Sequence, residues 1–135
     1  MKRAEAWQTT PTMWEISQET VVAAAHQLRF APGEGERLHG HNWRIRATLR
    51  ASELDARGFV VDFADLGATL RALVEPYEHV FLNDIPPFSD INPTAENIAR
   101  VVADGLAAKV DDARVKVVRV DVWENDQCKA TYYRA

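Results

Sequence analysis

An alternating run at residues 39–49 is the feature that most constrains this sequence. His39, His41 and Trp43 share one face of the run with the apolar residues that follow, and arginines and other polar residues occupy the opposite face. Period-two alternation of this kind predicts a half-buried β-strand. Because residues i and i+2 of a strand point the same way, we expect the two imidazoles to converge on the apolar side.

A third histidine, His26, ends a Val- and Ala-rich pattern that predicts a strand within residues 13–28. If this strand pairs with the next one around the loop at residues 29–37, His26 lies opposite His39 and His41. Three imidazoles with one open position are typical of a catalytic zinc site. The alternative is that two of the three histidines have structural roles only, because a lone His-x-His motif is weak.

The chain has 135 residues, a net charge of −4 and one cysteine, Cys128. This length predicts a single domain over residues 13–135, preceded by a flexible tail at residues 1–12. One cysteine excludes a disulfide framework and a cysteine-rich zinc module, so a metal site must use histidine and carboxylate ligands. We expect Cys128 to be a small buried residue.

The charge and the hydropathy pattern exclude several classes of partner. The mild acidity argues against nucleic-acid binding, which requires a basic face. No targeting segment and no apolar run long enough to span a bilayer is visible, so we expect a cytoplasmic protein that does not bind membranes.

The middle of the chain predicts one short strand and one helix. The strand is expected at residues 59–62, and the helix follows with leucines at helical spacing until Pro76 ends it. Residues 77–90 are expected to be irregular.

The last third of the chain predicts a second helix and two strands. Thr94 is a candidate N-cap for a helix over residues 95–109. Residues 115–123 and 128–133 read as the last strands. The order β-β-α-α-β-β predicts an α+β fold with both helices on one face of the sheet.

Several short motifs then follow one another in the order found in one enzyme family. They are Ala24-Ala25-His26, Arg37-Leu38-His39-Gly40-His41-Asn42, Val61-Asp62-Phe63-Ala64-Asp65-Leu66, Glu78-His79, Leu82-Asn83-Asp84, Asn92-Pro93-Thr94-Ala95-Glu96-Asn97 and Val122-Trp123-Glu124. As an ordered set over residues 14–133, they resemble the 6-pyruvoyl-tetrahydropterin synthase and 6-carboxytetrahydropterin synthase family.

This resemblance implies the tunnelling fold, a four-stranded antiparallel sheet with two helices on one face. It implies a homo-hexamer, a dimer of trimers, with active sites between subunits. It also implies a small-molecule pterin substrate and Zn²⁺ held by three ligands, His26, His39 and His41. Zinc at that place polarises the hydroxyl groups of a dihydroneopterin side chain.

The resemblance also assigns substrate-binding and proton-transfer residues. Glu124 is implied to bind the pterin, because one carboxylate can accept hydrogen bonds from the amino group and the ring N–H together. Thr94 is implied as a second pterin contact, unless it serves only as a helix cap. His79 is implied as the proton shuttle, paired with Glu78 where the family carries aspartate; Asp84 is the alternative partner.

The sequence departs from the family four residues before His39, where Gly35 replaces the catalytic cysteine. Glu36 comes next, and its E-x-x-H-G-H pattern resembles the branch that lacks the cysteine and uses glutamate as the base. That branch implies retro-aldol cleavage of dihydroneopterin to 6-hydroxymethyl-dihydropterin, for folate synthesis. The rival is that Glu36 is only a loop charge, as its neighbour Glu34 is.

Other functions stay open at this point. One is formation of 6-pyruvoyl- or 6-carboxytetrahydropterin, for tetrahydrobiopterin or queuosine, despite the missing cysteine. Others are a paralogue that binds zinc and pterin without turnover, and a structural zinc protein. Whether the substrate carries a triphosphate is also open, and no arginine is assigned to it.

Overall fold

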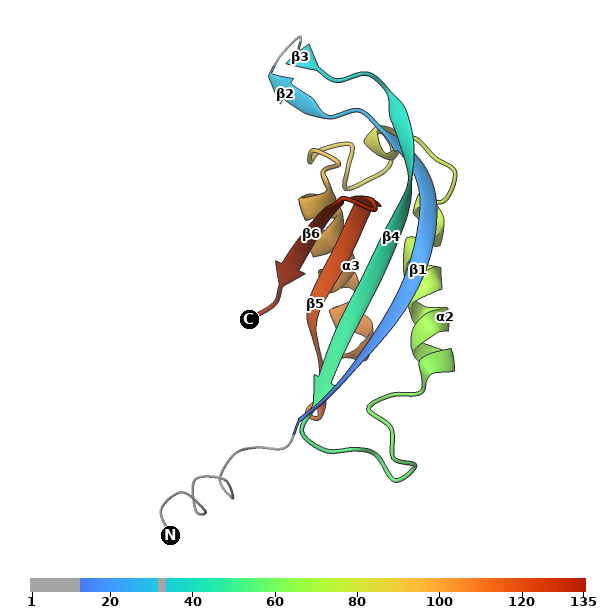
Figure 1. Ribbon diagram of the computed structural model, residues 1–135, viewed down its shortest axis with the longest axis vertical. Helices are drawn as coiled ribbons and strands as arrows, with labels where there is room; N and C mark the ends of the chain where they lie inside the picture. Colours follow the sequence, from blue (N-terminus) through green and yellow to red (C-terminus); the bar gives the residue numbers. More distant parts are fainter. Residues whose placement is uncertain (1–12, 32–33) are drawn as a thin grey trace.

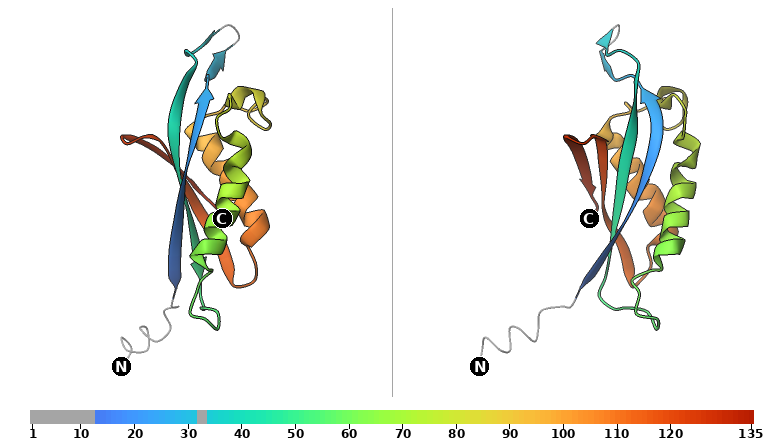
Figure 2. Two further views of the ribbon diagram at one scale, coloured as in Figure 1. Left: turned by 90° about the vertical axis from the view of Figure 1, so that its right-hand side faces the viewer. Right: turned by 45° about the vertical axis from the view of Figure 1, so that its right-hand side comes forward.

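A four-stranded antiparallel sheet with the strand order β1-β4-β5-β6 forms one layer of the computed structural model, which describes residues 13–31 and 34–135. The predicted tail, residues 1–12, lies outside the described residues. Two helices cover one face of the sheet (Figures 1 and 2). The elements are β1 (Trp14–His26), β4 (His39–Ala51), α2 (Phe63–Val74), α3 (Ala95–Val110), β5 (Val115–Asn125) and β6 (Cys128–Tyr133). The predicted α+β tunnelling fold is confirmed.

The hydrophobic core lies between the sheet and the two helices. Trp43 and Leu49 of β4 are fully buried there, and so are Leu70 of α2 and Leu106 of α3. The alternation predicted for β4 is therefore observed. The core side of β4 continues into its two histidines, so the site adjoins the packed core of the fold.

A β-bulge in β5 changes which of its residues face the helices. Val118 has no partner on β4, because its neighbours Val117 and Arg119 pair with consecutive residues of that strand. The buried valines of β5 accordingly change from odd-numbered positions before the bulge to even-numbered positions after it. Glu124, two residues beyond the buried Val122, therefore lies on the helix side of the sheet.

The strand predicted at residues 59–62 is wrong, because this segment is an irregular approach to α2. The guanidinium of Arg114 donates to the carbonyls of Glu53 (2.9 Å), Phe59 (3.3 Å) and Val60 (2.7 Å). A side chain thus satisfies the carbonyls that a neighbouring strand would otherwise have to pair. Asp62 then caps α2, accepting a hydrogen bond from the Ala64 N–H at 2.7 Å.

Short elements also occur in two segments that the sequence pattern marks as irregular. The loop between β1 and β4 forms a small ribbon of β2 (Arg29–Ala31) and β3 (Glu34–Gly35), which extends past the end of the sheet (Figure 1). The chain between the helices contains two 3₁₀ turns, η1 (Glu75–Tyr77) and η2 (Leu82–Asp84).

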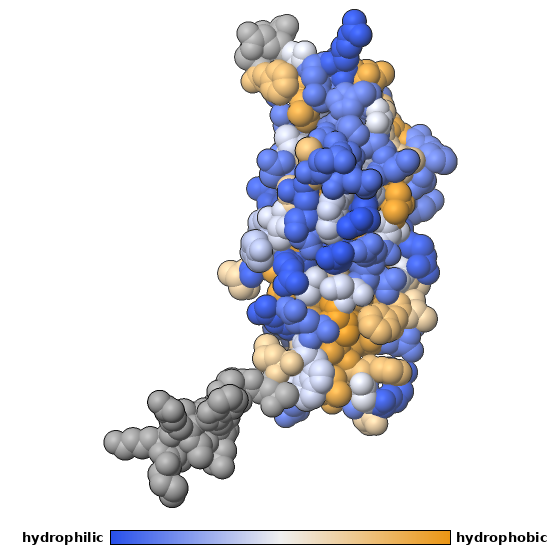
Figure 3. Space-filling model, in the orientation of Figure 1, coloured by the Kyte–Doolittle hydropathy of each residue, from blue (hydrophilic) through white to orange (hydrophobic). Residues whose placement is uncertain are grey.

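The sheet face opposite the helices is polar. Figure 3 shows it as largely hydrophilic. Arg44 and Arg46 of β4 lie on this face over the ring of Trp123, and both form ion pairs with Glu19. Within the described part of the chain, no helix is both long enough and apolar enough to cross a membrane.

Candidate functional site

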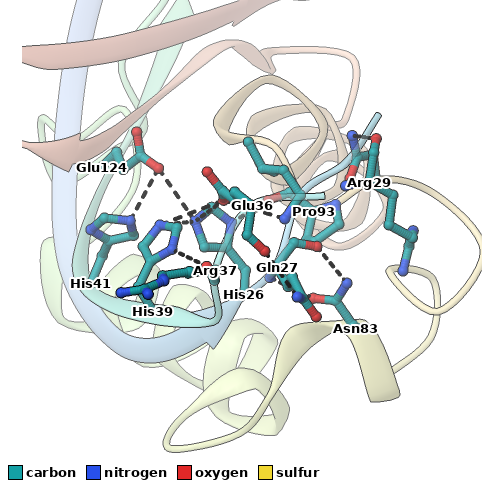
Figure 4. A network of polar contacts seen from close by, with 12 residues as sticks. His26, Gln27, Arg29, Glu36, Arg37, His39, His41, Asn83, Pro93 and Glu124 are labelled. Atoms are coloured by element: carbon teal, nitrogen blue, oxygen red, sulfur yellow. Dashed lines mark hydrogen bonds and ion pairs between the residues drawn. The ribbon is translucent and has the colours of Figure 1, made fainter. Parts of the chain in front are cut away.

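Three histidine side chains meet where β1 and β4 pair at one end of the sheet. His26 is directly opposite His39, and His41 is opposite Ala24. The ring centroids of the three imidazoles lie 4.6–5.1 Å apart. The strand pairing expected from the sequence is observed, and it brings together the three residues proposed as metal ligands (Figure 4).

Backbone carbonyls determine which ring nitrogens face the centre. The Nδ1 of His26 lies 2.8 Å from the Pro93 carbonyl, and the Nδ1 of His39 lies 2.7 Å from the Arg37 carbonyl. Because a carbonyl only accepts, each Nδ1 must carry the proton when its imidazole is neutral. The Nε2 lone pairs of His26 and His39 then face each other at 3.0 Å. Such a pair is stable only with a cation or a proton between its members.

His41 completes the set of donors. Its Nε2 is buried without a hydrogen-bond partner among the described residues. Burial lowers the pKa of His41, and so do the neighbouring imidazoles, while Glu124 acts in the opposite direction. A lowered pKa favours the neutral imidazole, which is the form that binds metal ions.

Two carboxylates face these nitrogens. Glu124 Oε1 lies 3.3 Å from His26 Nε2 and 3.1 Å from His41 Nε2. Glu36 Oε1 lies 3.7 Å from His26 Nε2 and 3.6 Å from His39 Nε2. The ligand atoms of the three histidines and Glu124 all fall within 4.8 Å of one another. Neutral imidazoles with an adjacent carboxylate are a donor set that suits Zn²⁺.

Gly35 lies close against the backbone of Leu28. A Cβ built on Gly35 would lie 3.0 Å from the backbone carbonyl oxygen of Leu28. The same carbonyl accepts from the Glu36 N–H at 3.3 Å, and the Leu28 N–H donates to Glu36 Oε1 at 3.2 Å. A side chain at Gly35 would therefore need the backbone of Leu28 to shift by a few tenths of an ångström, and the carboxylate of Glu36 occupies the space beside the histidines.

Glu78 and His79 pair with each other, and among the described residues neither makes an ion pair with Glu36 or Glu124. Their side chains approach to 3.1 Å, and the side chain of His79 is 78% exposed. Glu78 also accepts from the Ala23 N–H on the edge of β1 at 3.3 Å. His79 lines an open groove in which His41 also takes part. Among the ion pairs of the described residues, the partner of His79 is Glu78 and not Asp84.

Thr94 caps α3 beside the site. The Thr94 Oγ1 accepts a hydrogen bond from the Asn97 N–H at 3.1 Å, so the predicted N-cap is observed. Thr94 directly follows Pro93, whose carbonyl contacts His26. Glu124 and Cys128 both line a groove at this end of α3. The prediction that Cys128 is buried is wrong: the cysteine is exposed, because it starts β6, the edge strand, directly after a turn.

Comparison with known proteins agrees with these observations. The family model described as 6-pyruvoyl tetrahydropterin synthase matches residues 15–135. A 6-carboxy-5,6,7,8-tetrahydropterin synthase of Bacillus subtilis is 33% identical over 119 residues, covering 84% of this chain and 79% of the relative. A dihydroneopterin monophosphate aldolase of Pyrococcus furiosus is 30% identical over 104 residues, covering 77% and 83%.

A solved structure shows the same fold. The 6-pyruvoyl tetrahydropterin synthase of Caenorhabditis elegans superposes with a TM-score of 0.79 at 22% identity, covering 92% of this chain and 97% of that one. The family match spans nearly the whole chain and includes every residue of the histidine–carboxylate cluster. The chain therefore belongs to the 6-pyruvoyl tetrahydropterin synthase family.

Proposed function

We propose that the protein is a zinc-dependent lyase that cleaves the side chain of 7,8-dihydroneopterin, or of a phosphorylated form, to 6-hydroxymethyl-dihydropterin. One observation carries the proposal. The Glu36 carboxylate lies 3.6–3.7 Å from the Nε2 atoms of His39 and His26, next to Gly35, which carries no thiol. A carboxylate at this place suits removal of a hydroxyl proton, the first step of a retro-aldol reaction.

In this proposal, His26, His39 and His41 hold the metal through Nε2. When bound there, Zn²⁺ supplies a Lewis acid that lowers the pKa of a substrate hydroxyl. Glu36 accepts the proton from the hydroxyl on the second side-chain carbon. The bond between the first and second carbons then breaks, and its electron pair passes to the pterin ring.

The first carbon must then be protonated, and we assign this step to His79. Glu78 orients the His79 imidazole at 3.1 Å and accepts the Ala23 N–H, so it also holds the pair against β1. The proton taken by Glu36 and the proton given by His79 balance, and the second fragment leaves as glycolaldehyde.

Glu124 and Thr94 are the proposed contacts for the pterin. Among the described residues, the contacts of Glu124 with His26 and His41 use Oε1. Its other oxygen is available to the pterin amino group, and a shift away from the imidazoles would allow a bidentate pair. The groove that Glu124 lines at the start of α3 is open enough for a flat ring.

A second reaction is favoured by a different observation. The Bacillus subtilis relative described as a 6-carboxytetrahydropterin synthase is slightly more similar than the Pyrococcus furiosus aldolase. The alternative is therefore formation of 6-carboxy- or 6-pyruvoyl-tetrahydropterin. We favour the retro-aldol reaction, because the other two products require removal of a proton from carbon, which favours a more basic thiolate than the carboxylate of Glu36.

We also propose assembly as a homo-hexamer, a dimer of trimers, with each site shared by two subunits. The exposed pair of Glu78 and His79 supports this, because it makes no ion pair with Glu36 within the described part of the chain. A pair displayed on the surface is available to a neighbouring copy.

Substitution of Glu36 tests the proposed base. Glu36→Gln removes the charge but keeps the shape, so the rate of cleavage should fall by about 100-fold while zinc content is unchanged. Glu53→Gln, in an exposed loop, is the matched control and should keep the wild-type rate. A Glu36→Gln protein with full activity would refute the assignment. Tight pterin binding without turnover, lost in Glu124→Ala, would indicate a binding protein instead.

A further inference from the structure

We propose that Asn83 and Asn92 are positioning residues that hold residues 27–29, and through them Glu36, against the histidine cluster. The proposal rests on the proposed role of Glu36 as the base. Among the described residues, neither asparagine forms a hydrogen bond with a histidine of the cluster. Each acts on the backbone between His26 and Glu36.

Within the described residues, one edge of β1 pairs with β4 and the other edge pairs with no strand of the main sheet. Loop backbone occupies this edge at two positions. The His79 N–H donates to the Ala23 carbonyl at 2.6 Å, and the Ala25 N–H donates to the Val80 carbonyl at 3.0 Å. Ala23 and Ala25 are two residues apart, the spacing at which one edge of a strand presents its hydrogen-bonding groups.

Two asparagine side chains continue the same edge beyond His26. The Gln27 N–H donates to Asn83 Oδ1 at 3.0 Å, and Asn83 Nδ2 donates to the Gln27 carbonyl at 2.7 Å. The Arg29 N–H donates to Asn92 Oδ1 at 2.9 Å, and Asn92 Nδ2 donates to the Arg29 carbonyl at 2.8 Å. A side-chain amide offers the same donor and acceptor as a peptide group. Each asparagine side chain therefore makes the same pair of hydrogen bonds that one residue of a neighbouring strand would make.

The same short segment, residues 27–29, also forms hydrogen bonds with Glu36. Gln27 Nε2 donates to the Glu36 carbonyl at 2.9 Å. Leu28, between the two clamped residues, donates its N–H to the Glu36 carboxylate at 3.2 Å and accepts the Glu36 N–H at 3.3 Å. Figure 4 shows Gln27, Asn83 and Arg29 on the side of Glu36 away from Glu124. Displacement of residues 27–29 would move the carboxylate directly.

Both asparagines are themselves held. The Asn92 carbonyl accepts from Asn97 Nδ2 at 2.9 Å and from the Thr94 N–H at 2.8 Å, which ties it to the start of α3. Asn83 belongs to the 3₁₀ turn η2. The Arg29 guanidinium adds two hydrogen bonds to this loop, to the carbonyls of Phe88 and Ile91. These two bonds tie the Arg29 side chain to the loop.

A positioning role makes a specific kinetic prediction. Misplacing a base affects the transition state more than substrate binding, so kcat should fall while KM changes little. The pterin contacts proposed for Glu124 and Thr94 lie outside the clamped segment. A change in KM alone would therefore indicate a different role.

The test is a double-mutant cycle on the full-length, zinc-loaded protein. Asn83→Ala and Asn92→Ala should each lower kcat by about tenfold, and neither should lower the residual rate of Glu36→Gln by more than about twofold. Asn83→Asp keeps the acceptor and loses the donor, so its effect should be intermediate. Asp55→Ala is the matched control, because it removes two side-chain hydrogen bonds to backbone N–H groups in a remote loop. It should leave kcat unchanged.

Hydrogen–deuterium exchange provides a readout that does not require turnover. Both alanine variants should exchange faster at residues 27–36, and Asp55→Ala should not. Equal losses of kcat in the wild-type and Glu36→Gln backgrounds, or unchanged exchange at residues 27–36, would overturn the proposal. If the wild-type protein cleaves no dihydroneopterin, the proposed function fails, and the exchange result alone then decides whether the two asparagines hold the segment.

Discussion

The carbonyls of Pro93 and Arg37 matter as much at the residue scale as the histidines they contact. Because these carbonyls accept hydrogen bonds from Nδ1, the Nε2 atoms of His26 and His39 carry lone pairs, and these face each other. In metalloproteins generally, a hydrogen bond to the ring nitrogen that does not bind the metal orients a histidine ligand. The histidines are recognisable from the sequence because their spacing has a geometric meaning. The carbonyls are not, because a backbone acceptor leaves no trace in residue type.

The first prediction concerns the metal. Zinc at 100 times its dissociation constant should stabilise the fold by about 2.7 kcal/mol, because it binds only the folded arrangement. His41→Ala removes one ligand and should abolish this stabilisation, whereas His79→Ala should retain it. The measurement is zinc content together with thermal unfolding with and without the metal. Wild-type zinc content in His41→Ala would contradict the three-histidine centre.

At the scale of elements, the sequence pattern predicts the four strands of the main sheet and both helices, but not the details that orient Glu124. The valines of residues 115–122 pass from odd-numbered to even-numbered positions at Val118, but a Val-rich strand can bury valines on either face, so this change alone does not predict a bulge. The bulge decides that Glu124 faces the histidines. The wrong strand at residues 59–62 has a similar origin. Arg114, more than fifty residues away, satisfies its carbonyls, and such a long-range contact has no local signal.

The second prediction concerns the start of α3. Thr94→Ala removes the side-chain acceptor for the Asn97 N–H and should lower the free energy of unfolding by about 1 kcal/mol. Thr94→Ser keeps the acceptor and should be close to wild type. Urea unfolding measures both, with Thr69→Ala in α2 as a control. A Thr94→Ala protein as stable as wild type would show that the cap contributes nothing.

The third prediction concerns the turn between α3 and β5. Hydrogen bonds from the Val115 and Arg114 N–H groups lower the pKa of Asp112 below its ordinary value of 3.8. A lowered pKa in the folded state means that stability is present above the ordinary value and is lost as the pH falls through the folded value.

Asp112→Asn tests this, because an amide oxygen can still accept both bonds but does not titrate. Its free energy of unfolding should fall less than that of wild type between pH 5 and about pH 2. Asp126→Asn, in the turn before β6, is the control. Equal acid sensitivity in wild type and Asp112→Asn would contradict the assignment.

At the scale of the whole molecule, the proposed reaction uses two groups that make no ion pair with each other among the described residues. Glu36 lies with the histidines, whereas Glu78 and His79 pair at the exposed edge of β1. In the proposed hexamer, a second copy supplies one of the two groups to each site. No pattern within one chain reveals this, because the contact depends on how copies associate.

The fourth prediction follows from shared sites. Glu36→Gln and His79→Ala should each be nearly inactive alone, and mixed oligomers of the two should recover about a quarter of the wild-type rate, since random mixing places both intact residues in one site of four. Unfolding and refolding the variants together, followed by an activity assay, measures this. Recovery of no activity in mixed oligomers would mean that each site is built from one chain.

The most direct test of the account is the identity of the products. The zinc-loaded protein should convert 7,8-dihydroneopterin, or its phosphate, to 6-hydroxymethyl-dihydropterin and release glycolaldehyde, free or phosphorylated, in equal amount. Mass spectrometry of the pterin and an assay for the aldehyde measure both. Formation of 6-pyruvoyl- or 6-carboxytetrahydropterin without that aldehyde would contradict the proposed reaction.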